Sequence, residues 1–203
     1  MITTTGSLIV FEGLDRCGKT TQIELLIKKL KEDNKKVVTF KFPARETTIG
    51  KMIDSYLKES TEIEDHVIHL LFSANRWELI NIIKKHLNEG TTVILDRYIY
   101  SGIAFSSAKG LDLEWCKSSD EGLIQPDLII FLDITIEELV KRSGFGEERY
   151  EKKEFQNKVR NQFTEIHKNH YSELSKCWLI LDATLNINDL HHKIYEIIIK
   201  MKL

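Results

Sequence analysis

A glycine-bracketed loop near the N-terminus carries the residues best suited to chemistry. It reads Gly13-Leu14-Asp15-Arg16-Cys17-Gly18-Lys19-Thr20 and matches the pattern G-x-x-x-x-G-K-[ST]. The two glycines allow the backbone to bend so that successive N–H groups point into one concavity. Lys19 would then reach the β- and γ-phosphates of a nucleotide, and the Thr20 hydroxyl would bind Mg²⁺. The loop therefore predicts binding of a nucleoside triphosphate.

Charged residues in and beyond this loop could bind further groups. Arg16 could face negative charge developing on a transferred phosphoryl group, and Asp15 could orient an acceptor or its sugar. Asp96 and Arg97 follow an apolar run, and open parallel sheets carry their ligand site where strands end. Asp96 could hold Mg²⁺, directly or through water, and Arg97 could clamp an acceptor phosphate. Arg45 also follows an apolar run and is a second candidate for clamping a phosphate. The alternatives are a solvated loop pair for Asp15 and Arg16, a local salt bridge for Asp96 and Arg97, and an ordinary exposed arginine for Arg45.

Two other segments could complete a nucleotide site. Phe72 and Arg76 lie four residues apart in a helical pattern, so they share a helix face. A ring and a guanidinium placed there could stack on a base and hydrogen-bond its edge, whereas core packing beside a surface arginine is the alternative. Residues 141–151 are dense in charge and contain two glycines. This composition is typical either of a mobile lid over phosphates or of a solvated loop.

These residues must be positioned by strands that alternate with helices. Apolar runs of strand length are separated by segments with helical periodicity. The expected strands are residues 7–11, 37–42, 91–95, 127–132 and 178–181, and the expected helices are 19–33, 63–87, one beginning at 135, 152–170 and 186–200. Such alternation implies βαβ units. The sequence predicts an α/β fold: a doubly wound parallel five-stranded sheet flanked by helices, in a single domain of residues 1–203 with the lid at about 141–151.

Composition argues against several other classes of protein. Lysine and arginine number 29 against 31 acidic residues, and a formal net charge of −2 disfavours binding to nucleic acid or to a membrane surface. Cys17, Cys116 and Cys177 show neither disulfide nor zinc spacing. The N-terminus has no signal-peptide pattern, and no apolar run approaches the ~18 residues of a membrane span. We therefore expect a cytoplasmic protein.

The order of these motifs resembles the eukaryotic-type thymidylate kinases, P-loop nucleoside-monophosphate kinases, over nearly the full chain. The segments that carry the resemblance are 11–22 (FEGLDRCGKTTQ), 42–45 (FPAR), 70–78 (LLFSANRWE), 96–98 (DRY), 101–105 (SGIAF), 122–127 (GLIQPD) and 148–151 (ERYE). The helix with Phe72 and Arg76, followed by the DRY segment, distinguishes this family from adenylate and guanylate kinases.

The resemblance implies transfer of the γ-phosphoryl group of Mg-ATP to dTMP in dTTP biosynthesis, by a homodimer. The implied catalytic residues are Asp15, Arg16, Lys19 and Arg97, and ATP would bind the loop from Gly13 to Thr21 with Arg142 near adenine. The implied dTMP site comprises Asp15 at the 3′-hydroxyl, Phe42, Arg45, Phe72 on the base, Arg76 at its edge, Arg97, Ser101, Phe105, and Tyr150 where a ribose 2′-hydroxyl would lie. A cis Phe42–Pro43 bond is expected as well.

Other nucleotide-dependent functions remain as alternatives. A kinase of another monophosphate or of a deoxynucleoside would share the loop. A small GTPase normally carries an Asn-Lys-x-Asp motif after a strand, and the sequence has none. Intact Lys19, Thr20, Asp96 and Arg97 disfavour an inactive relative. Two positions depart from the family: Cys17 stands where a small residue is usual, and Leu185 where relatives often carry a lysine or arginine near adenine.

Overall fold

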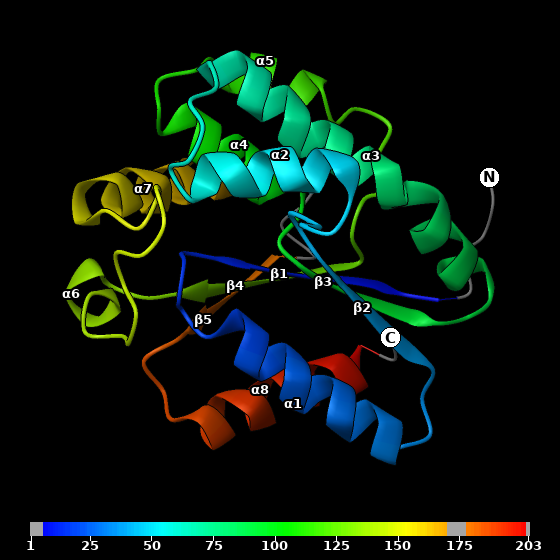
Figure 1. Ribbon diagram of the computed structural model, residues 1–203. Helices are drawn as coiled ribbons and strands as arrows, with labels where there is room; N and C mark the ends of the chain where they lie inside the picture. The colour runs from blue at the N-terminus through cyan, green and yellow to red at the C-terminus, as the bar shows by residue number, and fades with distance from the viewer. Residues whose placement is uncertain (1–5, 170–177, 202–203) are drawn as a thin grey trace.

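A parallel sheet lies at the centre of the computed structural model, which describes residues 6–169 and 178–201 (Figure 1). Within these residues the strand order is β2-β3-β1-β4-β5, and every neighbouring pair is parallel. The strands are β1 (Leu8–Gly13), β2 (Val37–Lys41), β3 (Thr92–Asp96), β4 (Leu128–Asp133) and β5 (Trp178–Asp182). The central strands are buried on both faces, which explains their near-continuous apolar runs.

Helices cover both faces of the sheet, as Figure 1 shows. The helices α1 (Lys19–Glu32) and α8 (Ile187–Lys200) pack together on one face. The other face carries α3 (Asp65–Asn88), α4 (Ile99–Ser107) and α7 (Lys153–Asn169), with α2 (Thr48–Leu57), α5 (Leu113–Ser118) and the short α6 (Ile136–Leu139) around them. This arrangement confirms the predicted doubly wound α/β fold.

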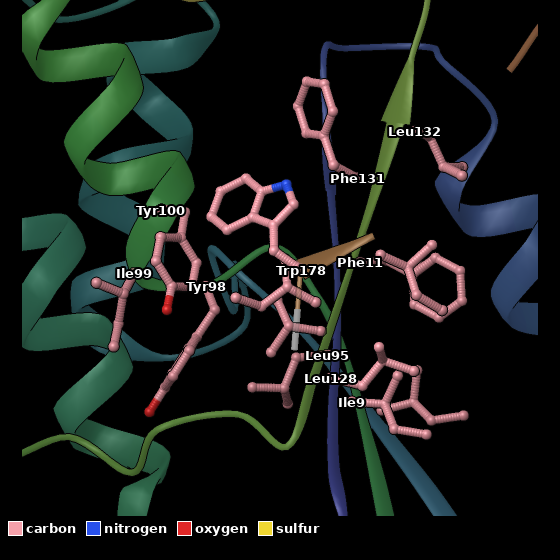
Figure 2. Packing of buried hydrophobic residues seen from close by; sticks show 14 of the residues in the cluster. Ile9, Phe11, Leu95, Tyr98, Ile99, Tyr100, Leu128, Phe131, Leu132 and Trp178 are labelled. Atoms are coloured by element: carbon pink, nitrogen blue, oxygen red, sulfur yellow. The ribbon is translucent and has the colours of Figure 1, made fainter. Parts of the chain in front are cut away.

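Apolar side chains fill the space between the sheet and its helices. Figure 2 shows Ile9 and Phe11 on one side of the sheet and Tyr98 and Trp178 on the other. Ile9 and Phe11 are two residues apart on β1, so the alternation of side chains along a strand places them on the same face. Ile9 and Phe11 are fully buried. In the register, Ile9 lies between Ile94 of β3 and Leu128 of β4, so the three central strands are held in one hydrophobic core.

The predicted strands and helices agree with the structure, with shifts at their ends. The predicted end of the 152–170 helix at His170, like Cys177, lies outside the described residues. Helices α2, α4 and α5 were not predicted. Helix α4 is almost entirely buried, so it shows no apolar stripe that would reveal a helix. In the described residues, no helix has the length and apolar character needed to cross a bilayer.

Candidate active site

A cleft of about 520 Å³ lies beyond the carboxyl ends of the central strands. Chain segments that are far apart in sequence line it: the glycine-bracketed loop, the turn after β2, helices α3 and α4, and residues 142–151. The predicted site residues on its wall are Asp15, Arg16, Gly18, Lys19, Thr20, Thr21, Phe42, Arg45, Phe72, Arg76, Asp96, Arg97, Ser101, Phe105, Arg142 and Tyr150. Leu14 and Cys17 are instead buried in the core beneath the loop.

The loop after β1 has the backbone that its glycines allow. Gly13 has φ 141°, and a Cβ there would lie 2.6 Å from the Leu132 carbonyl oxygen. Gly18, at φ 104°, directly precedes α1, so the amino end of that helix opens toward the cleft. Lys19 Nζ donates to the Leu14 carbonyl oxygen at 2.7 Å and is buried over the loop. The concavity is thus suited to an anion.

Thr20 and Asp96 meet at the mouth of this loop. Thr20 Oγ1 donates to Asp96 Oδ2 at 2.9 Å, and Lys41 Nζ lies 3.8 Å from the same oxygen. The other carboxylate oxygen, Asp96 Oδ1, is buried without a hydrogen-bond partner among the described residues. A hydroxyl and an under-coordinated carboxylate fit Mg²⁺, which is held by few protein oxygens together with phosphate and water. No group of three or more metal-binding side chains occurs in the described chain.

Arg97 connects the loop to the start of α4. It has φ 70°, which turns the chain sharply after β3. Its guanidinium donates to the Gly13 carbonyl oxygen at 2.8 Å, to Ser101 Oγ at 2.9 Å and to Asp15 Oδ1 at 2.6 Å. It also lies 5.2 Å from the centroid of the Phe105 ring. The guanidinium is therefore fixed at the floor of the cleft, between the loop and the predicted acceptor pocket.

Two buried polar residues support this arrangement and were not identified from the sequence. Glu12 accepts hydrogen bonds from the backbone N–H groups of Tyr98 and Ser101 and from the Ser101 hydroxyl. Burial raises the pKa of Glu12, while Ser101 and Arg97 act in the opposite direction. Gln156 Nε2 donates to Asp15 Oδ2 at 2.8 Å and to the Tyr150 carbonyl oxygen at 2.9 Å. A charged residue inside an apolar strand was the available signal for Glu12; Gln156 had none.

Carboxylates of residues 147–151 face two predicted phosphate-binding arginines. Arg16 donates to Glu151 at 2.8 Å and to Glu147 at 2.7 Å, and the bond to Glu151 is the main cause of its raised pKa. Arg45 donates to both oxygens of Glu148, at 2.7 and 3.0 Å. Phosphates bound in the cleft would compete with these carboxylates for the same donors.

Arg142, from the same charged segment, lies on the opposite side of the loop from the acceptor residues. Its Nη2 donates to the Ala183 carbonyl oxygen at 2.9 Å, close to the turn that carries Leu185. Arg142 thus lies against the chain two residues before Leu185, the other position that the resemblance connects with adenine.

Aromatic side chains and Arg76 form the remaining wall of the cleft. Phe72 and Arg76 both line it, one helical turn apart on α3, as predicted. Tyr150 is buried, and the centroid of its ring lies 5.4 Å from the centroid of the Phe105 ring. The Phe42–Pro43 bond is cis, which confirms that expectation. This wall offers flat apolar surfaces and one guanidinium to a planar ligand.

Arg76 is not the surface arginine of the alternative interpretation. Its side chain is buried, with Nε donating to Asp120 Oδ1 at 3.0 Å and Nη2 donating to Asp120 Oδ2 at 2.6 Å. Asp120 lies 44 positions after Arg76 in the chain, and it is a third site residue that was not identified from the sequence. Nothing in the local pattern around Asp120 indicated this pairing.

A family model, curated relatives and a solved structure all match this chain to thymidylate kinases. The model of the thymidylate kinase family matches residues 11–194. The chain is 53% identical to a thymidylate kinase of Schizosaccharomyces pombe, over 95% of this chain and 91% of that protein, and 43% identical to a human thymidylate kinase, over 93% and 88%. The solved structure of a thymidylate kinase from Candida albicans superposes with a TM-score of 0.87 at 42% identity, covering 97% of this chain and 92% of the other.

Proposed function

Because this chain belongs to the thymidylate kinase family, we propose that it transfers the γ-phosphoryl group of Mg-ATP to dTMP, giving dTDP and ADP for dTTP synthesis. One observation carries the proposal. A single cleft combines a triphosphate-binding loop with a second, separate set of arginines next to an aromatic pocket. A kinase with a phosphorylated acceptor needs both sets, since two anions must be held against their mutual repulsion.

The reaction is a direct in-line attack by a dTMP phosphate oxygen on the γ-phosphorus of ATP. The phosphate monoester is already nucleophilic near neutral pH, so the chain forms no phospho-enzyme. Lys19 and Arg16 offset negative charge on the transferring group, and Arg97 with Arg45 holds the acceptor phosphate. Mg²⁺, held by Thr20 and by Asp96 directly or through water, would neutralise charge on the β- and γ-phosphates.

The sugar binds beside Asp15 of the loop, and the base binds farther out against the aromatic wall of α3 and α4. Phe72 stacks on thymine, and Arg76 donates to its edge. Phe42, Ser101 and Phe105 line the nucleoside pocket, and Asp15 contacts the 3′-hydroxyl. The buried Tyr150 ring occupies the region of a ribose 2′-hydroxyl and so favours deoxyribose.

Residues 141–151 act as a lid on a single kinase domain. Their carboxylates hold Arg16 and Arg45 before substrates bind, and phosphates then take over both arginines. With phosphates bound beneath it, the lid keeps water from the γ-phosphoryl group. Arg142 lies near adenine, together with the turn at Ala183.

The enzyme forms a homodimer through α3. Val67, Leu70 and Trp77 occupy one side of this helix at spacings of three and seven residues, and 49%, 49% and 37% of their surfaces are exposed. An apolar stripe of this kind, present identically on a second copy, is suited to a two-fold symmetric contact.

The free thiols of Cys17 and Cys116 fit a reducing compartment, and we propose that the enzyme is cytoplasmic.

The substrate assignment is tested by ADP release from Mg-ATP with purified protein and dTMP, dUMP, dCMP, dGMP, dAMP and UMP in turn. We expect dTMP to give the highest kcat/KM. A higher kcat/KM with a purine or with a ribonucleotide would contradict the assigned pocket while leaving the kinase fold intact.

A further inference from the structure

Asp120 is the buried counter-ion of Arg76, the arginine of α3 that lines the cleft beside Phe72. We propose that Asp120 positions Arg76 and thereby makes the pocket prefer a pyrimidine with a carbonyl at C4, such as thymine, over one with an amino group there, such as cytosine. This inference rests on the proposed kinase function, because it concerns the acceptor of that reaction.

The pair has the geometry of a fixed fork. Both Asp120 oxygens accept from Arg76, at 3.0 Å from Nε and 2.6 Å from Nη2, and the exposed fractions of the two side chains are 1% and 3%. Gly102 of α4 closes on the other side, since a Cβ there would lie 2.7 Å from Nη2. The guanidinium can therefore neither swing away from Asp120 nor move toward α4.

The segment that carries Asp120 is itself tied to α3. Ser73 Oγ lies within hydrogen-bond distance of Asp120 Oδ1, at 2.7 Å, and of the Ser119 carbonyl oxygen, at 2.8 Å. Trp77 Nε1 donates to the same carbonyl at 3.1 Å, and His69 Nε2 lies 3.1 Å from Ser119 Oγ. Side chains from three successive turns of α3 thus hold the segment 119–120, Ser73 touches the carboxylate itself, and Arg76 comes from the same helix. Arg76, which faces the base, and its counter-ion Asp120 are therefore held together as one rigid unit.

This fixation leaves a defined donor for a ligand. Nε and Nη2 are engaged by Asp120, and no hydrogen bond joins Nη1 to any residue that the structure describes. A guanidinium has no acceptor, so a carbonyl oxygen on the base is complementary to Nη1 and an amino group is not. A freely rotating arginine could turn away from the amino group; one held by Asp120 cannot, and a donor facing a donor is left unpaired.

Equilibrium binding of dTMP and dCMP, measured by calorimetry without turnover, tests the inference. We expect the wild-type protein to prefer dTMP, and Asp120→Asn to reduce that preference at least ~10-fold, mainly through weaker dTMP binding. Affinity for ATP, which binds at the opposite side of the cleft, should not change. In an Arg76→Met background, Asp120→Asn should alter the preference less than about twofold, since Asp120 acts through Arg76.

Two serine variants keep the test decisive. Ser73→Ala removes a partner of Asp120 without changing charge, and should lower the preference about threefold even if Asp120→Asn does not fold. Ser118→Ala is the matched control, because in the described part of the chain its hydroxyl donates to the Trp115 carbonyl oxygen and to neither Asp120 nor Arg76. An unchanged dTMP preference in folded Asp120→Asn, or in Ser73→Ala where Asp120→Asn is unfolded, would overturn the inference. Wild-type protein that binds no dTMP would overturn the proposed function, and the inference with it.

Discussion

Replacing Gly102 by alanine should damage dTMP binding while leaving phosphoryl transfer largely intact. A Cβ at residue 102 would lie 2.7 Å from Arg76 Nη2 and 3.0 Å from Nη1. Ordinary contacts between heavy atoms are ~3.5–4.0 Å, so the guanidinium must retreat by roughly 1 Å. Asp120 holds it at 2.6 and 3.0 Å, and the movement therefore misaligns the donor that faces the base.

The expected loss is that of one hydrogen bond to a charged donor, about 1.5–3 kcal/mol, or roughly 10- to 150-fold in the KM for dTMP. The KM for ATP should hold, and kcat should fall only modestly. The assay is ADP release with dTMP titrated at saturating Mg-ATP. Alanine favours a helix over glycine by about 1 kcal/mol, so the melting temperature should not collapse.

An Arg76→Ala background provides the matched control, since Gly102→Ala should then have little further effect on the KM for dTMP. A KM for dTMP within twofold of wild type in Gly102→Ala would show that the Arg76 guanidinium does not lie where the base binds.

Four further variants test other parts of the account. Arg16→Ala should lower kcat at least ~100-fold with little change in the KM for dTMP; a raised KM with kcat preserved would contradict its role. Asp96→Asn should raise the Mg²⁺ concentration required for half-maximal rate, and an unchanged titration would exclude Asp96 from the metal site. Burial lowers the pKa of His69 below its ordinary 6.5, so the unfolded chain binds the extra proton first and stability declines as pH falls below 6.5, by at most ~1.4 kcal/mol per pH unit. Urea unfolding at pH 7.5 and 5.5 should show this decline reduced in His69→Gln, and an equal decline in both proteins would refute it. Leu70→Glu should give monomers in sedimentation velocity, whereas persistence of a dimer would place the interface elsewhere.

The features predictable from the sequence were local ones. Buried strands were recognisable as apolar runs of strand length. The glycines at fixed spacing predicted the backbone conformation of the loop from Gly13 to Thr20. Placing Asp96 and Arg97 at the carboxyl end of a strand also placed them beside that loop, since parallel strands share one ligand-binding edge. These inferences need only periodicity and topology.

The features that escaped prediction depend on contacts between distant residues. Gln156 meets Asp15 from 141 positions away, and Asp120 meets Arg76 from 44. Neither Gln156 nor Asp120 lies in a sequence pattern that distinguishes it from an exposed polar residue. Helix α4 escaped for another reason: it is buried almost all round, so apolar and small residues occupy every side and no period emerges.

The proposed reaction moves one phosphoryl group from one nucleotide to another, so analysis of its products is the decisive experiment. Mg-ATP and dTMP incubated with the protein should yield dTDP and ADP in a 1:1 ratio by chromatography, with no inorganic phosphate above background and none of either product in Lys19→Ala. Formation of ADP with inorganic phosphate and no dTDP, or dTDP formation undiminished in Lys19→Ala, would contradict the account.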